Sequence, residues 1–307
     1  MLMKQAKYYL AAITAFIIWG FFSLVLKPLH DYPSLDILFY RVFLCVTLMV
    51  GINLLFRRKI LKTAAANFKG MSSSEKRKAV ILTLGGALLL SANWFFFIYV
   101  MNHVSVKAAS FAYLVCPILT TVFAYFILQE KLNKLQWAAV GLSIFSCVLL
   151  CFNHFMDIFY SLIVAATYAL YLVSQKKNTS IDKFLLLSLQ LLVTGIILLP
   201  FYPFYSGTLP TEPKFYFYIA LIVMFFTIIP LFLNLYALKQ INSSTVGIML
   251  YLNPLINFML AIFYYKEDIT SFQIIAYSLI FFSILIFNAG VLLKRKPLHI
   301  TVIKNSI

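Results

Sequence analysis

Residues 108–136 read AASFAYLVCPILTTVFAYFILQEKLNKLQ, and residues 245–273 read TVGIMLYLNPLINFMLAIFYYKEDITSFQ. Each stretch opens with about 20 mostly apolar residues, the length that a helix needs to cross a bilayer. A shift of 137 residues superposes the proline, glutamate and glutamine of the two stretches, namely Pro117 on Pro254, Glu130 on Glu267 and Gln136 on Gln273. This match predicts an internal repeat that is built from membrane-spanning helices.

The rest of the chain is equally apolar. Of its 307 residues, 63% are hydrophobic and 11% are charged, and the mean hydropathy is +0.94. A soluble domain is about half apolar and about a quarter charged, so this composition argues against a soluble enzyme or a nucleic-acid-binding protein. An all-α integral membrane protein with ten transmembrane helices is predicted instead. The ten segments are 8–26, 37–56, 79–101, 108–128, 136–152, 158–174, 184–204, 215–237, 244–265 and 272–293.

The first two spans of each half align better with a shift of 149 residues, which brings Trp19 onto Tyr168 and Arg41 onto Gln190. Each half then contains five spans, and an odd number inverts the second copy in the membrane. The expected units are residues 1–152 and 153–296 for the two inverted repeats and 297–307 for a short cytoplasmic tail. Inverted repeats are typical of secondary transporters, whose substrate binds between the halves near the midplane. The alternative is a duplication without a mechanical role.

The basic residues predict how the chain is oriented. With a cytoplasmic N-terminus and alternating spans, 20 of the 25 lysines and arginines fall in inner segments and four fall in outer ones. Lysine and arginine in short loops set the orientation of membrane proteins, with the excess on the cytoplasmic side. We therefore expect both termini in the cytoplasm. The short loops favour a location in a bacterial cytoplasmic membrane.

Arg41 is the only charged residue inside the ten predicted spans. A charge in hydrocarbon costs at least about 2.5–3.5 kcal/mol, so it usually faces a cavity or a partner. One interpretation is that Arg41 binds a carboxylate or phosphate of the substrate, or a gating carboxylate such as Asp31, Asp36 or Asp157. The other is that it reaches the membrane interface or holds helix ends through backbone carbonyls.

Aromatic and amide side chains within the spans are the other candidates for a substrate cavity. Aromatic walls with a few amides suit an amphipathic organic solute. With Arg41, the candidates are Trp19, Asn93, Trp94, Tyr113, Tyr168, Gln190, Tyr251 and Asn253. Pro117 and Pro254 are candidate helix pivots, because a proline frees a carbonyl one turn earlier. The competing interpretations are interface anchors for the aromatic residues and plain helix packing for the small and polar stripes.

The remaining polar and sulfur-containing residues predict structural roles. Glu130 and Glu267, at matching helix ends, are interpreted as caps of a neighbouring helix or as partners of Lys131 and Lys266. The four cysteines lie inside spans without CxxC spacing, so neither a disulfide nor a zinc site is expected. The sequence contains no GxxxxGK[ST] or HExxH motif, so no cofactor, metal or catalytic site is predicted.

Further short motifs are spread over both halves. They are Ile18-Trp19-Gly20, Asp36-Ile37-Leu38 with Arg41-Val42, Asn93-Trp94 with Phe97-Ile98, Ala109-Ser110 with Tyr113 and Pro117, Glu130 with Gln136-Trp137, and then Thr227, Pro230, Ser244-Thr245, Gly247, Tyr251, Pro254 and Glu267. In these residues the chain resembles the drug/metabolite transporter superfamily, EamA family, and within it the RarD-like (chloramphenicol-sensitivity protein) branch. It departs from that branch at Cys116, where asparagine is usual, and at Gln129 and Lys266, where glycine usually precedes the glutamate. The resemblance implies a ten-helix metabolite or drug exporter and names no cargo.

The expected function is therefore secondary transport of a small organic solute, aromatic or anionic in character, by alternating access in the export direction. Helices 1–4 and 6–9 are expected to line the cavity, and helices 5 and 10 to close the edges. The alternative is a receptor or sensor that binds a small molecule without transporting it. A membrane enzyme would need a cluster of catalytic carboxylates or histidines, which the sequence lacks. The expected partners are the substrate and the lipid bilayer, without nucleic acid, and a homodimer is left open.

Overall fold

The computed structural model describes residues 2–103, 106–150, 155–266 and 271–293, which are helical apart from short connections. The helices are α1 (Leu2–Gly20), α2 (Phe22–Leu26), α3 (Ser34–Phe56), α4 (Arg58–Gly70), α5 (Ser73–His103), α6 (Val106–Leu128), α7 (Lys134–Leu150), α8 (Phe155–Lys177), α9 (Lys183–Leu198), α10 (Tyr202–Tyr205), α11 (Pro213–Val223), α12 (Ile229–Ala237), α13 (Ser243–Met249), α14 (Leu252–Phe263) and α15 (Ser271–Leu293). The 3-10 turns η1 (Lys27–Leu29) and η2 (Leu199–Phe201) and the π-helical turn η3 (Met224–Ile228) join some of them.

All ten segments predicted to span the membrane are helical over most of their described residues, so the all-α prediction is confirmed there. Within these residues, six helices are long and apolar enough to cross a bilayer, or seven when the α1–α2 pair, bent by 41°, counts as one span. The apolar stretches Ala112–Leu128 and Lys134–Leu150 are shorter. The structure is therefore that of a multi-pass membrane protein, and the count of ten spans remains a prediction.

Several predicted helices are interrupted near prolines. Pro200 lies in η2, Pro230 is the second residue of α12 after η3, and Pro254 lies just after the junction of α13 and α14. Proline has no backbone N–H, so the carbonyl one turn earlier loses its helical partner. The sequence pattern predicted continuous spans here because hydropathy does not register these interruptions.

Helix α4 lies in the basic segment 57–78, which separates the second and third predicted spans. Its Ala- and Lys-rich sequence consists mostly of good helix formers, and none of its residues is buried. The start of α5 carries a reciprocal cap, in which Ser72 N donates to Glu75 Oε2 at 2.9 Å and Glu75 N donates to Ser72 Oγ at 3.3 Å. The basic segment is therefore helical at the surface.

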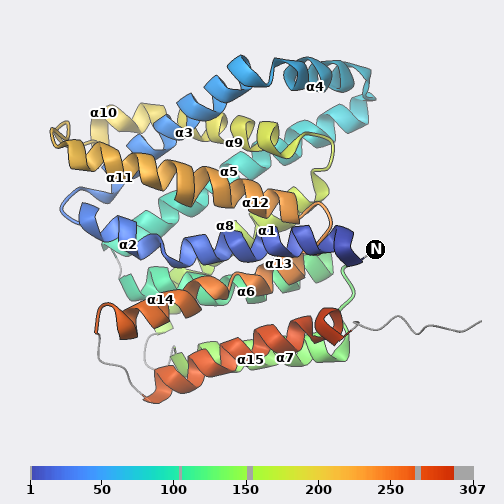
Figure 1. Ribbon diagram of the computed structural model, residues 1–307, viewed down its shortest axis with the longest axis vertical. Coiled ribbons are helices and arrows are strands. Elements are labelled where there is room, and N and C mark those ends of the chain that lie inside the picture. Colours follow the sequence, from blue (N-terminus) through green and yellow to red (C-terminus); the bar gives the residue numbers. More distant parts are fainter. Residues whose placement is uncertain (1, 104–105, 151–154, 267–270, 294–307) are drawn as a thin grey trace, which may run out of the picture.

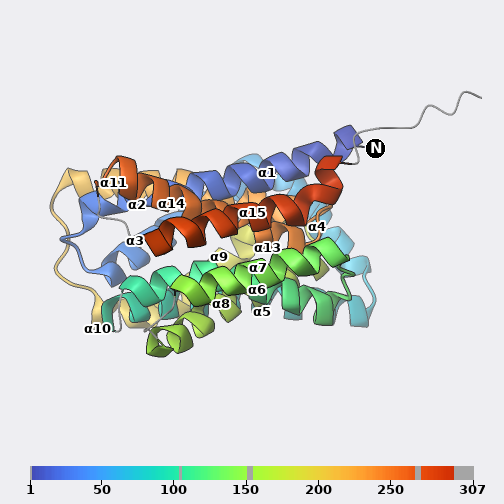
Figure 2. The same ribbon diagram turned by 90° about the horizontal axis from the view of Figure 1, so that it is seen from below.

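The long helices run alongside one another, so their ends gather at two opposite ends of the bundle (Figure 1). We call these the α2 end, where α2 and α10 lie, and the α4 end, where α4 and the beginning of α1 lie. The pair α7 and α15 forms one edge of the bundle, and α3 and α9 lie toward the opposite edge (Figure 1). Figure 2 shows α15 running beside α7 when the bundle is seen from below.

Helix contacts join segments that are far apart in the sequence. Helix α1 packs against α12 and α14, while α8 packs against α5 and α6. Glycines permit some of the closest approaches, because a Cβ at Gly20 would lie 2.6 Å from Ile256 Cβ and one at Gly247 would lie 2.7 Å from Thr120 Cγ2. Small residues at helix contacts are characteristic of membrane proteins, in which association depends on close packing.

The outer surface is apolar. Large side chains such as Phe56 (82% exposed), Phe126 (67%) and Phe145 (56%) point outward. Exposed patches of this extent are unusual for a soluble monomer but suit contact with lipid. The interior instead holds the polar side chains Thr120, Gln190 and Asn234, each fully buried.

Candidate functional site

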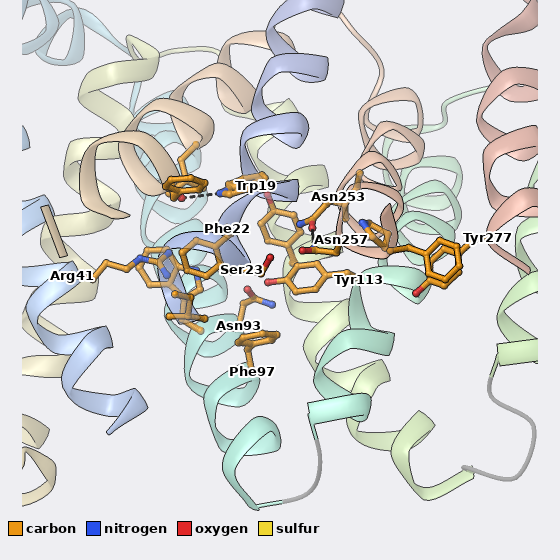
Figure 3. Close-up of a pocket in the computed structure, with 18 of the residues that line it drawn as sticks. Trp19, Phe22, Ser23, Arg41, Asn93, Phe97, Tyr113, Asn253, Asn257 and Tyr277 are labelled. Atoms are coloured by element: carbon orange, nitrogen blue, oxygen red, sulfur yellow. Dashed lines mark hydrogen bonds between the residues drawn. The ribbon is translucent and has the colours of Figure 1, made fainter. Parts of the chain in front are cut away.

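A cavity of about 560 Å³ lies within the bundle, lined by residues from both the first and the second half of the chain. Figure 3 shows Arg41 at one side of the cavity and Tyr277 at the other, with Ser23, Tyr113, Asn253 and Asn257 between them. The lining residues are Trp19, Phe22, Ser23, Leu26, Arg41, Asn93, Trp94, Phe97, Tyr113, Tyr168, Phe226, Leu231, Leu250, Asn253, Pro254, Asn257, Phe258, Tyr265, Gln273 and Tyr277. A space of this size is in the range that binds small organic molecules.

The orientation of Trp19 follows from a proline on another helix. Pro230 cannot donate to the carbonyl of Phe226, four residues earlier, and the chain passes through the π-helical turn η3 at this point. The indole Nε1 of Trp19 donates to this carbonyl at 2.8 Å (Figure 3). Because its N–H is engaged in this way, Trp19 offers the cavity its aromatic surface.

Two further predicted residues also have polar atoms that are engaged within the protein. Asn93 Nδ2 donates to Val164 O at 2.9 Å, which joins α5 to α8. The hydroxyl of Tyr168 accepts a hydrogen bond from Asn234 Nδ2 at 3.0 Å, and its ring lies edge-on to Trp19. These contacts fix the aromatic wall of the cavity.

Arg41 enters the cavity from α3 and stacks on an aromatic ring. Its guanidinium carbon lies 4.4 Å from the centre of the Trp94 ring, a cation–π distance. Its Nε is buried without a hydrogen-bond partner among the described residues. Of the carboxylates considered for it, Asp31 contacts His30 at 2.9 Å and Asp36 accepts from Gly207 N at 3.1 Å. The side chain of Asp157 lies outside the described residues.

A second cavity, of about 570 Å³, adjoins the first at the α2 end. The two share lining residues that include Ser23, Arg41, Trp94 and Tyr265. The second cavity continues past Lys27 in the η1 turn, His30 directly after it and Ser34 at the start of α3. The site is therefore accessible from the α2 end.

Glu130 ties helices together at the α4 end. The helix α6 ends with a left-handed residue, Gln129, whose φ is 56°, and Glu130 N donates to Ala124 O at 3.2 Å. The Glu130 carboxylate then accepts from Ser243 N at 2.7 Å and from Ser244 N at 3.0 Å. This contact caps α13 and confirms the interpretation of Glu130 as the cap of a neighbouring helix. Glu267 lies outside the described residues.

Other polar contacts close the same end. Lys176 Nζ donates to the carbonyl of Leu238 at 2.9 Å and to that of Ile241, which lie between α12 and α13. Arg57 pairs with Asp182 at 2.9 Å, between the end of α3 and the start of α9. Helices of both halves therefore meet at the α4 end through specific hydrogen bonds, whereas the α2 end opens into the cavities.

Two predicted cavity residues lie elsewhere. Gln190 is fully buried between α5, α8 and α9, where its Nε2 donates to Gln175 Oε1 at 2.7 Å. A Cβ at Gly86 would lie 2.2 Å from Gln175 Nε2, so the helices are too close there to leave a space. Tyr251 is fully buried in a cluster with residues of α6, α7 and α15, away from the lining. Neither residue lines these cavities, because alignment of the repeats indicates the depth of a residue in the membrane but not which neighbouring helix it faces.

The two prolines predicted as helix pivots lie in different local structures. Pro117 lies inside the continuous helix α6, while Pro254 lines the cavity just after the α13–α14 junction. The expectation that helix 10 only closes an edge is also corrected, since α15 contributes Gln273 and Tyr277 to the lining. The sequence held a signal for Gln273, because it is one of the polar positions that recur in both halves. Ser23 was not predicted and no pattern singled it out, while Phe97 belongs to one of the motifs that carry the family resemblance but was not named as a cavity candidate.

Comparison with known proteins places this architecture in a family. The model of the EamA-like transporter family matches residues 6–152 and 155–289. An uncharacterized transporter of Bacillus subtilis, YojE, is 28% identical over 281 residues, which cover 89% of this chain and 91% of that protein. The protein RarD of Escherichia coli is 24% identical over 91% of this chain and 92% of its own length. An uncharacterized transporter of Vibrio cholerae is 27% identical, with 91% of both chains covered.

The fold also has a counterpart among solved structures. A crystal structure superposes with a TM-score of 0.73 over 95% of this chain and 100% of that chain, at 13% sequence identity. At that level of identity the similarity concerns the fold alone.

Proposed function

The chain belongs to the EamA-like transporter family, and from this premise we propose that it is a secondary transporter that moves a small organic solute by alternating access. It is a membrane transporter and not an enzyme, as its family and its transporter relatives indicate. The proposed direction is export across the cytoplasmic membrane. The observation that carries the proposal is a cavity lined by both halves of the chain, open toward the α2 end and closed at the α4 end.

Three features support two inverted repeats of five spans each. The family match falls into two stretches of similar length. Gln129 and Lys266, 137 positions apart, both have a left-handed φ, of 56° and 57°. The contacts of α1 with α12 and α14 correspond to those of α8 with α5 and α6 when the halves are exchanged. A pseudo-twofold relation of this kind allows one half to rock against the other around a central site.

The distribution of basic residues assigns the two ends to the two sides of the membrane. The α4 end carries Lys176 and the basic helix α4, and under the positive-inside rule this supports a cytoplasmic location for that end. On this assignment the structure is an outward-open state. The transition to the inward-open state requires that the contacts of Glu130 and Lys176 break while the α2 end closes.

The proposal is tested by metabolite profiling of the medium of cells that overproduce the protein. A solute should accumulate outside with the wild type, and less with Arg41→Ala or Trp94→Ala at equal membrane abundance. Arg58→Ala, on the exposed helix α4, is the matched control and should behave as the wild type. The solute is then tested for saturable flux into and out of liposomes that contain the purified protein. A solute that binds saturably without flux would refute transport and favour a receptor.

A further inference from the structure

The polar groups of the cavity differ in whether the protein already satisfies them. Trp19 Nε1, Asn93 Nδ2 and the Tyr168 hydroxyl are each engaged in a hydrogen bond within the protein. In contrast, Arg41 Nε and Ser23 Oγ are buried and have no hydrogen-bond partner among the described residues. Both residues line the two adjoining cavities. Arg41 and Ser23 are therefore the lining residues whose buried polar atoms a bound solute would satisfy.

The charge of Arg41 also lacks a counterion in the described part of the chain. The ion pairs there are Arg57 with Asp182 and His30 with Asp31, and neither involves Arg41. Trp94 holds the guanidinium by stacking, which orients it but does not neutralise it. A guanidinium has five N–H donors in a planar fork that matches a carboxylate. A carboxylate is therefore the group that would best satisfy Arg41.

The second cavity, which leads from the α2 end to Arg41, also contains a positive charge. Lys27 lines the second cavity, and its Nζ lies 3.9 Å from the centre of the Tyr265 ring. No aspartate or glutamate is among the described residues that line either cavity. Charges of one sign along a low-dielectric passage concentrate ions of the opposite sign. The described lining from the α2 end to Arg41 therefore carries positive charge, which favours an anion over a cation in contact with it.

We propose that the cargo is an organic anion, whose carboxylate binds Arg41 and whose apolar body lies against Trp19, Trp94 and Tyr113. This inference rests on the proposed function, because it names the class of solute bound at the transport site. The Asn253–Asn257 pair, linked by a hydrogen bond of 2.7 Å, lies on the far side of Ser23 from Arg41 and receives a polar group at the other end of the solute (Figure 3). An arginine that only anchors α3 at the membrane interface would not select anions.

The test measures equilibrium binding to the purified full chain in nanodiscs, by tryptophan fluorescence and thermal stabilisation. The probes are 3-phenylpropanoate, its neutral amide 3-phenylpropanamide, and the cation 3-phenylpropylammonium, which share one apolar body. A charge-assisted pair with the buried guanidinium should make the carboxylate bind at least about 10-fold more tightly than the amide. The ammonium probe should bind most weakly.

Two variants separate this role from a structural one. Arg41→Gln should bring the carboxylate-to-amide ratio to about one while the amide still binds, and Arg41→Lys should restore part of the preference, because lysine keeps the charge but not the fork. Arg58→Gln on α4 is the matched control and should keep the wild-type ratio. If Arg41→Gln does not fold, Lys27→Gln should still weaken carboxylate binding, with a smaller dependence on salt concentration.

The proposal is overturned if the wild type binds amide and carboxylate equally, if Arg41→Gln keeps the preference, or if no carboxylate binding is measured up to about 10 mM. Its failure and that of the proposed function can be told apart. Selective carboxylate binding without flux in liposomes retains the anion site and refutes transport. Flux of a neutral or cationic solute that is unchanged in Arg41→Gln would support transport and refute the anion site.

Discussion

Replacement of Glu130 by glutamine tests whether the contact at the α4 end holds α13 against α6. The wild-type carboxylate accepts three hydrogen bonds, from Ser243 N at 2.7 Å, Ser244 N at 3.0 Å and Ser244 Oγ at 2.6 Å. Glutamine has the same shape but presents one carbonyl oxygen and one NH₂ group, which cannot accept from the backbone N–H it would face. The variant therefore loses at least one charge-assisted bond, which contributes about 1.5–3 kcal/mol.

A loss of this size should increase the opening of the α6–α13 contact by about 10- to 100-fold, because 1.4 kcal/mol corresponds to a factor of ten. The assay is hydrogen exchange of the protein in nanodiscs, followed in peptides that contain the first turn of α13. When local opening limits exchange at equilibrium, the exchange rate of the Ser243 and Ser244 amides rises by the same factor.

The matched control is Glu75→Gln, because Glu75 also accepts from a serine N–H and hydroxyl but within its own helix start. This variant should accelerate exchange near residue 72 only. A change of less than about threefold at the first turn of α13 in Glu130→Gln, or an equal change there in Glu75→Gln, would refute the assignment of Glu130 as the closing contact.

Three further substitutions test the packing. Gly86→Ala should lower the melting temperature, since its Cβ would lie 2.2 Å from the Gln175 amide, whereas Gly85→Ala, with nothing within 4 Å, should leave it unchanged or raise it; equal effects would contradict the close approach. Trp19→Phe should cost about 1–3 kcal/mol by leaving the carbonyl beside the π-helical turn unpaired, and Trp137→Phe, at an exposed ring, should cost little, as measured by denaturation in detergent. Gln129→Gly should stabilise the protein by up to about 1 kcal/mol, because φ is 56° there; a lower melting temperature would argue against strain at this position.

The spans were predictable because hydropathy is a local property. Each apolar segment must bury its backbone polar groups in its own helix, so length and composition are sufficient to locate it. The same reasoning failed at α4, whose helix depends on propensity and surface position, and at η3 and the α13–α14 junction, where Pro230 and Pro254 displace hydrogen bonds within otherwise uniform apolar runs.

The candidate site was predictable where residue type and depth suffice. Arg41, Trp19 and Asn253 line the cavity because a charge, a large ring or an amide inside a span needs a polar or open surrounding. Gln190 and Tyr251 satisfied the same criterion, yet Gln190 is bonded to Gln175 of α8 and Tyr251 is buried in an apolar cluster with residues of α6, α7 and α15. Whether a polar group within a span faces the cavity or a neighbouring helix depends on how its helix is rotated and packed. The sequence of a single helix does not determine this.

The sequence by itself determined that this chain is a helical membrane protein with a repeated pattern of proline, glutamate and glutamine, because lipid imposes one rule on every apolar segment. Only the tertiary structure decided which polar groups are satisfied. It brought the Trp19 indole to the carbonyl near Pro230 and the Glu130 carboxylate to the start of α13, and it left Arg41 Nε without a hydrogen-bond partner among the described residues. The physical reason is that a hydrogen bond between distant helices depends on how they pack together, whereas membrane insertion depends on each segment alone.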